Sequence, residues 1–262
     1  MNRSAIVLLA ALCALPSARA TEAQPCDAAA FEVAGRFLGI ADFDAEGEAS
    51  PVVAAACKPA PDQPGQLLAA FAYALSVGGK PPPEYDKQLA ILVIDRAHGR
   101  VLASRKDVIG EDAITRVGRD SLSLDTARYL LAPGVRAFGL RFSSDSPGPG
   151  CADASSGELL TLFAPEGRAL RPVLRLDMSA TQALAGCVGH GGPDTVVEGA
   201  SLTLEMAPTR SHGFADIVVR ARIETWAADD TKKMPKPRVE TRTLHYDGKS
   251  YPVGGEWWMQ DA

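Results

Sequence analysis

The sequence is poor in aromatic residues and in histidine, and it has no excess of positive charge. Phe, Trp and Tyr together make up 6% of its 262 residues, and four residues are histidine. The 27 basic residues are outnumbered by 32 acidic ones. An acidic chain without basic clusters is a poor ligand for nucleic acid and for anionic lipid surfaces. We therefore expect no nucleic-acid partner.

The chain also lacks the short motifs that mark the common active sites. It contains no Gly-x-Ser-x-Gly elbow, no His-Glu-x-x-His pair and no phosphate-cradling glycine loop. Ser211 and His212 with Asp216 supply the three residue types of a nucleophilic triad, but the side chains of adjacent residues mostly point apart. His190 lies in a glycine-rich loop, which is too flexible to preorganise catalysis unless a disulfide holds it. The sequence thus favours a protein without catalytic activity.

Long apolar runs are absent after the first twenty residues. Arg3 supplies a positive start, residues 5–15 are apolar, and Ala18-Arg19-Ala20 fits a small-x-small cleavage site. This pattern is typical of a secretory signal peptide, and the run is too short to span a membrane stably. No later stretch approaches the roughly 20 apolar residues of a transmembrane helix. We expect residues 1–20 to be a signal peptide that is cleaved near Ala20, and the product to be periplasmic or secreted.

Residues 21–262 are expected to form a single β-rich domain, because no change of composition divides them. Removal of residues 1–20 deletes two basic residues and no acidic one, which leaves 25 basic against 32 acidic residues and a net charge of −7. This length is ample for a hydrophobic core.

Four of the five cysteines lie in this domain. An even number of cysteines in an oxidising compartment indicates two disulfides, for which three pairings are possible. We favour the pairing of neighbours along the chain, Cys26–Cys57 and Cys151–Cys187. Each bond would close a loop of a few tens of residues and stabilise the fold by about 3–4 kcal/mol in the chain-entropy model. The alternative, a metal site on Cys187 and His190, needs free thiolates and further ligands.

Short alternating patterns separated by turns of Gly, Pro and Asp dominate the domain. Asp27 can cap a short helix that runs to about Leu38. Residues 89–94 with 100–104 and residues 158–163 with 169–177 have the pattern of hairpins, and Pro172 places its strand at an edge or at a bulge. About ten strands are expected in all. The sequence therefore predicts an antiparallel all-β fold with one short N-terminal helix.

An acidic segment at residues 39–50 has the composition of a calcium loop. Oxygen-bearing side chains at positions 42, 44 and 46 are followed by Gly47. Calcium takes roughly six to eight oxygen ligands, and a glycine permits the sharp turn that brings alternate side chains inward. The EF-hand version does not fit, because its twelfth position, counted from Asp42, is Val53 and not a bidentate Glu.

The segment at residues 39–57 resembles the FG-GAP repeat, an integrin-type, VCBS-like motif in which an Asp-x-Asp-x-Asp-Gly-x-x-Asp loop leads into an apolar strand. Residues 213–219 resemble the strand entry of a second such repeat. The resemblance implies a calcium site. Its side-chain ligands would be Asp42, Asp44, Glu46 and Ser50, and Glu48 would contribute its backbone carbonyl. Glu46 and Ser50 depart from the motif, which has Asp at both positions. No other cofactor is implied.

For the fold, this resemblance implies a small β-propeller, whereas the strand patterns fit a two-sheet sandwich equally well. The order of the segments is also similar to that of uncharacterised exported proteins of proteobacteria.

The sequence as a whole predicts a soluble exported binding or interaction module, stabilised by calcium, whose partner is an envelope protein or a ligand. Contacts are expected in the long loops at residues 78–86, 143–157 and 227–236, or at Trp257-Trp258 if this pair is exposed and does not pack back onto the sheet. Two alternatives stay open. One is a secreted hydrolase with a site around Ser211, His212 and Asp216 or near His190. The other is an enzyme inhibitor or immunity protein.

Overall fold

The computed structural model describes residues 24–44, 50–74, 86–189, 192–229, 231–255 and 257–258. Within these ranges the chain forms one helix and thirteen strands in two sheets. The elements are α1 (Ala28–Leu38), β1 (Val52–Pro59), β2 (Gln66–Tyr73), β3 (Asp86–Asp95), β4 (Arg100–Gly110), β5 (Leu122–Ala132), β6 (Val135–Ser143), β7 (Ala154–Ser156), β8 (Glu158–Glu166), β9 (Ala169–Asp177), β10 (Ser179–Ala185), β11 (Val196–Ser211), β12 (Phe214–Ala227) and β13 (Arg238–Leu244).

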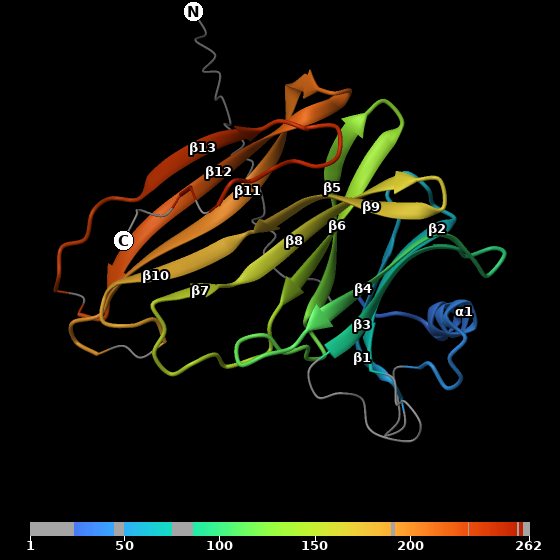
Figure 1. The fold of residues 1–262 in the computed structure, drawn as a ribbon, viewed down its shortest axis with the longest axis horizontal. Coiled ribbons are helices and arrows are strands. Elements are labelled where there is room, and N and C mark those ends of the chain that lie inside the picture. The colour runs from blue at the N-terminus through green and yellow to red at the C-terminus, as the bar shows by residue number, and fades with distance from the viewer. Residues whose placement is uncertain are drawn as a thin grey trace, which may run out of the picture.

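The larger sheet has eight strands in the order β1-β2-β3-β4-β9-β8-β6-β5 and curves into a nearly closed barrel (Figure 1). Its two edge strands, β1 and β5, come together through Gln24. The carbonyl of Gln24 accepts a hydrogen bond from the backbone N–H of Cys57 in β1 at 2.9 Å. The side-chain amide of Gln24 donates to the carbonyl of Leu124 in β5 at 3.0 Å and accepts from its N–H at 2.7 Å. Gln24 thus bridges β1 and β5, which do not pair directly with each other.

The inside of the barrel is filled by alternate side chains of its strands. Ile91, Phe138 and Phe163 are among the residues of this interior cluster, and each is at most 8% exposed. Alternation follows from the pleat, which sends successive side chains to opposite faces. Residues on the outer face of the barrel therefore need other cover, and they receive it from two different elements.

Helix α1 covers the outer face of β1, β2 and β3 (Figure 1). Its start is fixed by Asp27, whose side chain accepts a hydrogen bond from the N–H of Ala30 at 2.9 Å. Its end is fixed by Gly39 in the left-handed conformation. Phe31 packs against Phe71 of β2 with ring centroids 5.3 Å apart. The helix is joined to β1 by the Cys26–Cys57 disulfide, whose Cα atoms are 4.9 Å apart.

The second sheet covers the outer face of β5, β6, β8 and β9 (Figure 1). It has five strands in the order β13-β12-β11-β10-β7 and is antiparallel throughout. Ile217, Val219 and Ile223 of β12 are at most 1% exposed and face the barrel. Trp258 closes this layer from the C-terminal tail with 2% exposure.

In the described residues the structure confirms the predicted all-β class, a mainly antiparallel pairing, in which only β4 and β9 are parallel, and a single short helix. Both predicted hairpins form as β3–β4 and β8–β9, and Pro172 lies at a register shift in β9. Sheets of eight and five strands packed face to face resemble a sandwich more than a set of four-stranded propeller blades. Thirteen strands exceed the ten that were predicted. Residues 250–253 form no ladder, although the backbone N–H of Tyr251 donates a hydrogen bond to the carbonyl of Val173 at 2.7 Å.

No helix in the described part of the chain has the length and apolar character needed to cross a membrane. Of the three predicted long loops, that at residues 78–86 lies outside the described residues except for Asp86, which begins β3.

Candidate functional site

A hollow opens where β4 and β9 separate. These two strands are parallel neighbours in the barrel, but they share one pairing, Ser104 with Ala169. There the N–H of Ser104 donates to the carbonyl of Arg168 at 3.0 Å. Beyond this point β4 continues to Gly110 and β9 to Asp177, each paired in the barrel only with its antiparallel neighbour. The resulting hollow has a volume of about 1120 Å³.

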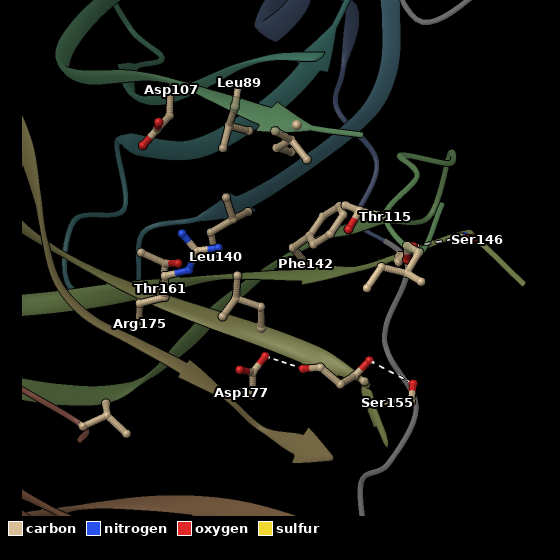
Figure 2. A pocket seen from close by; sticks show the side chains of 18 of the residues that line it. Leu89, Asp107, Thr115, Leu140, Phe142, Ser146, Ser155, Thr161, Arg175 and Asp177 are labelled. Carbon is tan, nitrogen blue, oxygen red and sulfur yellow. Dashed lines mark hydrogen bonds between the residues drawn. The ribbon is translucent and has the colours of Figure 1, made fainter. Parts of the chain in front are cut away.

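The floor of the hollow is apolar. It is lined by Leu89 of β3 and by Leu140 and Phe142 of β6 (Figure 2). Phe163 of β8 lines it as well. All four belong to the interior cluster of the barrel or pack against it. The floor is therefore the face of the barrel core that borders the hollow, and an apolar molecule placed on it would continue the packing of that core.

Charged side chains stand on the two walls above this floor. Arg105 and Asp107 lie on β4, whereas Arg175 and Asp177 lie on β9. Figure 2 shows Asp107 with Leu89 on one side of the space, and Arg175 and Asp177 on the other. Arg175 is paired across the sheet with Thr161 of β8, which also lines the hollow.

The four charges differ in their partners. Arg105 donates to Asp107 on its own wall, with a shortest N–O distance of 2.8 Å. Asp177 accepts a hydrogen bond from the hydroxyl of Ser156. Arg175 is exposed and has no ion pair or hydrogen bond to any described residue. Arg175 is the one of these four side chains without a hydrogen-bond or ion-pair partner among the described residues.

The rim of the hollow is held by a disulfide and by short hydrogen bonds. Cys151 and Cys187 are bonded with their Cα atoms 5.1 Å apart, which is the pairing favoured from the sequence. Beside them the backbones of Ala152 and Val188 exchange two hydrogen bonds of 2.8 and 3.4 Å. These contacts fasten the loop after β6 to the end of β10. Cys187 is thus not available as a thiolate ligand, and His190 lies outside the described residues.

Ser211 and Asp216 are brought together with a histidine, but this is His245 and not His212. The hydroxyl of Ser211 lies 3.3 Å from Nδ1 of His245. Oδ1 of Asp216 lies 3.3 Å from the same nitrogen. A nucleophilic triad needs the serine and the carboxylate on opposite ring nitrogens. His212 contacts the carbonyl of Tyr246 through its Nδ1 at 2.8 Å instead.

The carboxylate of Asp216 is almost fully buried. Burial alone would raise its pKa, but hydrogen bonds from Thr209, at 2.7 Å, from Ser211 and from His245 lower the pKa below its ordinary value. The carboxylate therefore joins the β11–β12 hairpin to the end of β13. This structural role accounts for all the residue types that suggested a hydrolase in this segment.

The predicted calcium ligands are described in part. Asp42 has a positive φ of 53° and Asp44 is exposed. The hydroxyl of Ser50 donates to the carbonyl of Asp44 and accepts from the N–H of Val52 at 3.1 Å. Glu46 and Glu48 lie outside the described residues. Among the residues that are described, no three His, Cys, Asp or Glu side chains gather in a metal-binding cluster.

The predicted tryptophan pair is packed into the protein. Trp258 is buried in the layer between the barrel and the second sheet, and Trp257 packs against it at a centroid distance of 5.4 Å. Arg242 lies over the ring of Trp257 at 5.8 Å. The pair thus tethers the C-terminal tail, as the second of the two interpretations expected. The exposed tryptophan is Trp226, which covers Gly199 on the outer face of the second sheet.

Sequence reasoning did not find the hollow. Arg105, Asp107, Arg175 and Asp177 have the alternation of ordinary solvent-facing strand residues, and nothing local distinguishes them. Comparison of the chain with family models, with curated proteins and with solved structures finds no match. Function is therefore inferred from the geometry alone.

Proposed function

We propose that the protein is a non-catalytic binding module of the periplasm that takes an elongated apolar ligand into the hollow between β4 and β9. The observation that carries the proposal is the floor of Leu89, Leu140, Phe142 and Phe163, through which the apolar core of the barrel borders the hollow. Small-molecule sites are typically apolar concavities of about 300–1,000 Å³ with a few polar groups. A hollow of about 1120 Å³ is slightly larger than this range.

The construction of the hollow favours binding without large rearrangement. Its walls are strands of one barrel, and its rim is fastened by Cys151–Cys187. A preformed site loses little conformational entropy when it is filled, so more of the contact energy appears as affinity. Each methylene group that a ligand buries on the floor contributes roughly 0.8 kcal/mol.

Two further features support a periplasmic location. Two disulfides are formed, and such bonds persist in oxidising compartments. The signal-peptide pattern of residues 1–20 directs the chain to the same place.

The proposal is tested by titrating the protein with Nile red, an uncharged dye that becomes fluorescent in apolar surroundings. Thr161→Trp fills the hollow, because Thr161 lines it from β8. Thr203→Trp is the matched control, because Thr203 is exposed on the outer face of β11. We expect the wild type and Thr203→Trp to bind the dye equally, and Thr161→Trp to bind at least about tenfold more weakly, a difference of about 1.4 kcal/mol. Absence of binding, or equal binding by all three proteins, would contradict the proposal.

A further inference from the structure

Arg175 is a cation without a counter-charge at the edge of an apolar floor. Its neighbours on the walls each have a partner, since Arg105 pairs with Asp107 and Asp177 accepts a hydrogen bond from Ser156. Arg175 has no such partner in the described part of the chain. A guanidinium carries five N–H donors in a fixed fork that fits a carboxylate through two parallel hydrogen bonds.

The register of the barrel places this cation relative to the floor. Leu140 of β6 is paired with Thr161 of β8, and Thr161 is paired with Arg175 of β9. The three side chains form one row across adjacent strands, and all three line the hollow (Figure 2). Neighbouring strands are about 4.8 Å apart, so Arg175 stands roughly 10 Å from the apolar end of its row. A ligand that follows this row has its polar end on β9 and its apolar end over β6.

We propose that the ligand is a single-chain amphiphile with a terminal carboxylate, whose chain lies on the floor and whose carboxylate pairs with Arg175. This inference rests on the proposed function and names the chemical class of the ligand. One carboxylate satisfies one guanidinium, and the hollow has room for a long chain beside it.

Other head groups suit the walls less well. A phosphate monoester carries almost two negative charges, and the carboxylates of Asp107 and Asp177 line the same hollow. A cationic head would meet Arg175 and would have to compete with Arg105 and Ser156 for the two carboxylates. A neutral head leaves the guanidinium without a partner. A single carboxylate supplies the partner that Arg175 lacks and brings the least additional negative charge near Asp107 and Asp177.

The test compares four ligands of equal chain length for displacement of bound Nile red: dodecanoate, dodecyl phosphate, dodecanol and dodecyltrimethylammonium. The dodecanol is kept below its solubility limit and each of the others below its micelle concentration. The proteins are the wild type, Arg175→Gln, Arg175→Lys and the matched control Arg128→Gln. Arg128 is exposed on β5, lies outside the hollow and also has no partner in the described part of the chain. Thermal unfolding of each variant shows that the fold is retained.

We expect dodecanoate to displace the dye at about a fivefold lower concentration than dodecanol, the upper end of what one ion pair at an exposed site contributes. Arg175→Gln should remove this preference while leaving dodecanol unchanged, Arg175→Lys should restore part of it, and Arg128→Gln should behave as the wild type.

Equal displacement by dodecanoate and dodecanol would contradict the proposal that the ligand is a carboxylate, as would tighter binding of dodecyl phosphate or dodecyltrimethylammonium. Either result would leave the proposed binding function in place. Persistence of the preference in Arg175→Gln would overturn the role of Arg175. Failure of the wild type to bind Nile red or any of the four amphiphiles would overturn the proposed function itself.

Discussion

The side chain of Gln24 donates to the carbonyl of Leu124 and accepts from its N–H, so that one amide replaces a strand pairing across 100 residues of sequence. The backbone of Gln24 is bound at the same time to Cys57 on the opposite edge strand. The barrel is therefore closed by a side chain on one flank, whereas on the other flank β4 and β9 separate and leave the hollow. The closed flank holds the barrel in shape, and the open flank is available to a ligand.

Replacement of Gln24 by alanine should destabilise the protein by about 1–3 kcal/mol, because the N–H and carbonyl of Leu124 lose their partners in a partly buried place. Gln63→Ala is the matched control, since Gln63 is exposed and its side chain makes no hydrogen bond to a described residue. Denaturant unfolding of both variants measures the difference. Equal stability of Gln24→Ala and Gln63→Ala would contradict the closing role of Gln24.

Asp125 should make stability depend on pH. Burial alone would raise the pKa of Asp125, but the N–H of Ala127 and the guanidinium of Arg141, 2.6 Å away, lower it below the ordinary value near 3.8. A carboxyl group whose pKa is lower in the folded state stabilises the protein above the unfolded pKa, and this contribution is lost as the pH falls through the folded value. Asp125→Asn should therefore cost about 2–3 kcal/mol at pH 7.

Urea denaturation at pH 7, 4 and 3 tests this behaviour. The difference between the wild type and Asp125→Asn should begin to shrink below about pH 4, where the carboxyl of the unfolded chain takes up a proton, and should shrink further as the pH falls toward the lower pKa of the folded state. Asp62→Asn serves as the control. Asp62 also pairs with an arginine, Arg136, but its side chain is 61% exposed, and exposed ion pairs contribute only about 0–1 kcal/mol to stability. A difference for Asp125→Asn that stays constant with pH would argue against the ion pair as its cause.

The two disulfides should have separable effects. Cys26–Cys57 joins α1 to the barrel, so Cys26→Ala/Cys57→Ala should lower the free energy of unfolding by about 3–4 kcal/mol and leave Nile red affinity unchanged. Cys151–Cys187 holds the rim, so Cys151→Ala/Cys187→Ala should weaken Nile red binding several-fold. Both double variants are compared by denaturation and by dye titration. Unchanged affinity after removal of Cys151–Cys187 would show that the rim does not shape the site.

The acidic segment at residues 42–50 predicts a calcium effect on stability. An ion that binds only the folded protein raises the melting temperature by mass action. The melting temperature in millimolar calcium should be higher than in a chelator, and Asp44→Ala should abolish this difference. Asp62→Ala, a change of another exposed aspartate, should retain it. Identical melting curves with calcium and with chelator would show that the segment holds no ion.

Local structure was predictable from the sequence because its signals are local. Asp27 marked the start of α1, the turn at residues 95–99 marked the β3–β4 hairpin, and Pro172 marked a bulge. The tertiary arrangement was not predictable in the same way. Alternation shows that a strand has two faces, but it does not show that Ser104 meets Ala169 or that Gln24 meets Leu124.

The candidate site was not predictable for the same reason. Its floor consists of residues that look like any core strand positions, and its charges look like any solvent-facing ones. What makes them a site is the separation of β4 from β9, which depends on contacts across 65 residues. The sequence instead suggested a site at Ser211, His212 and Asp216. These residues have the types found in a nucleophilic triad, but their contacts hold the β11–β12 hairpin against the residues that follow β13.

We propose above all that a long-chain carboxylate binds in the hollow between β4 and β9. This claim is tested most directly by backbone chemical shifts of the ¹⁵N-labelled protein during titration with dodecanoate. Shifts should change at Gly110, Thr161 and Arg175, and not at Gly199 or Thr203 on the outer face of the second sheet. Changes confined to that outer face, or no changes with dodecanoate in excess, would contradict the claim.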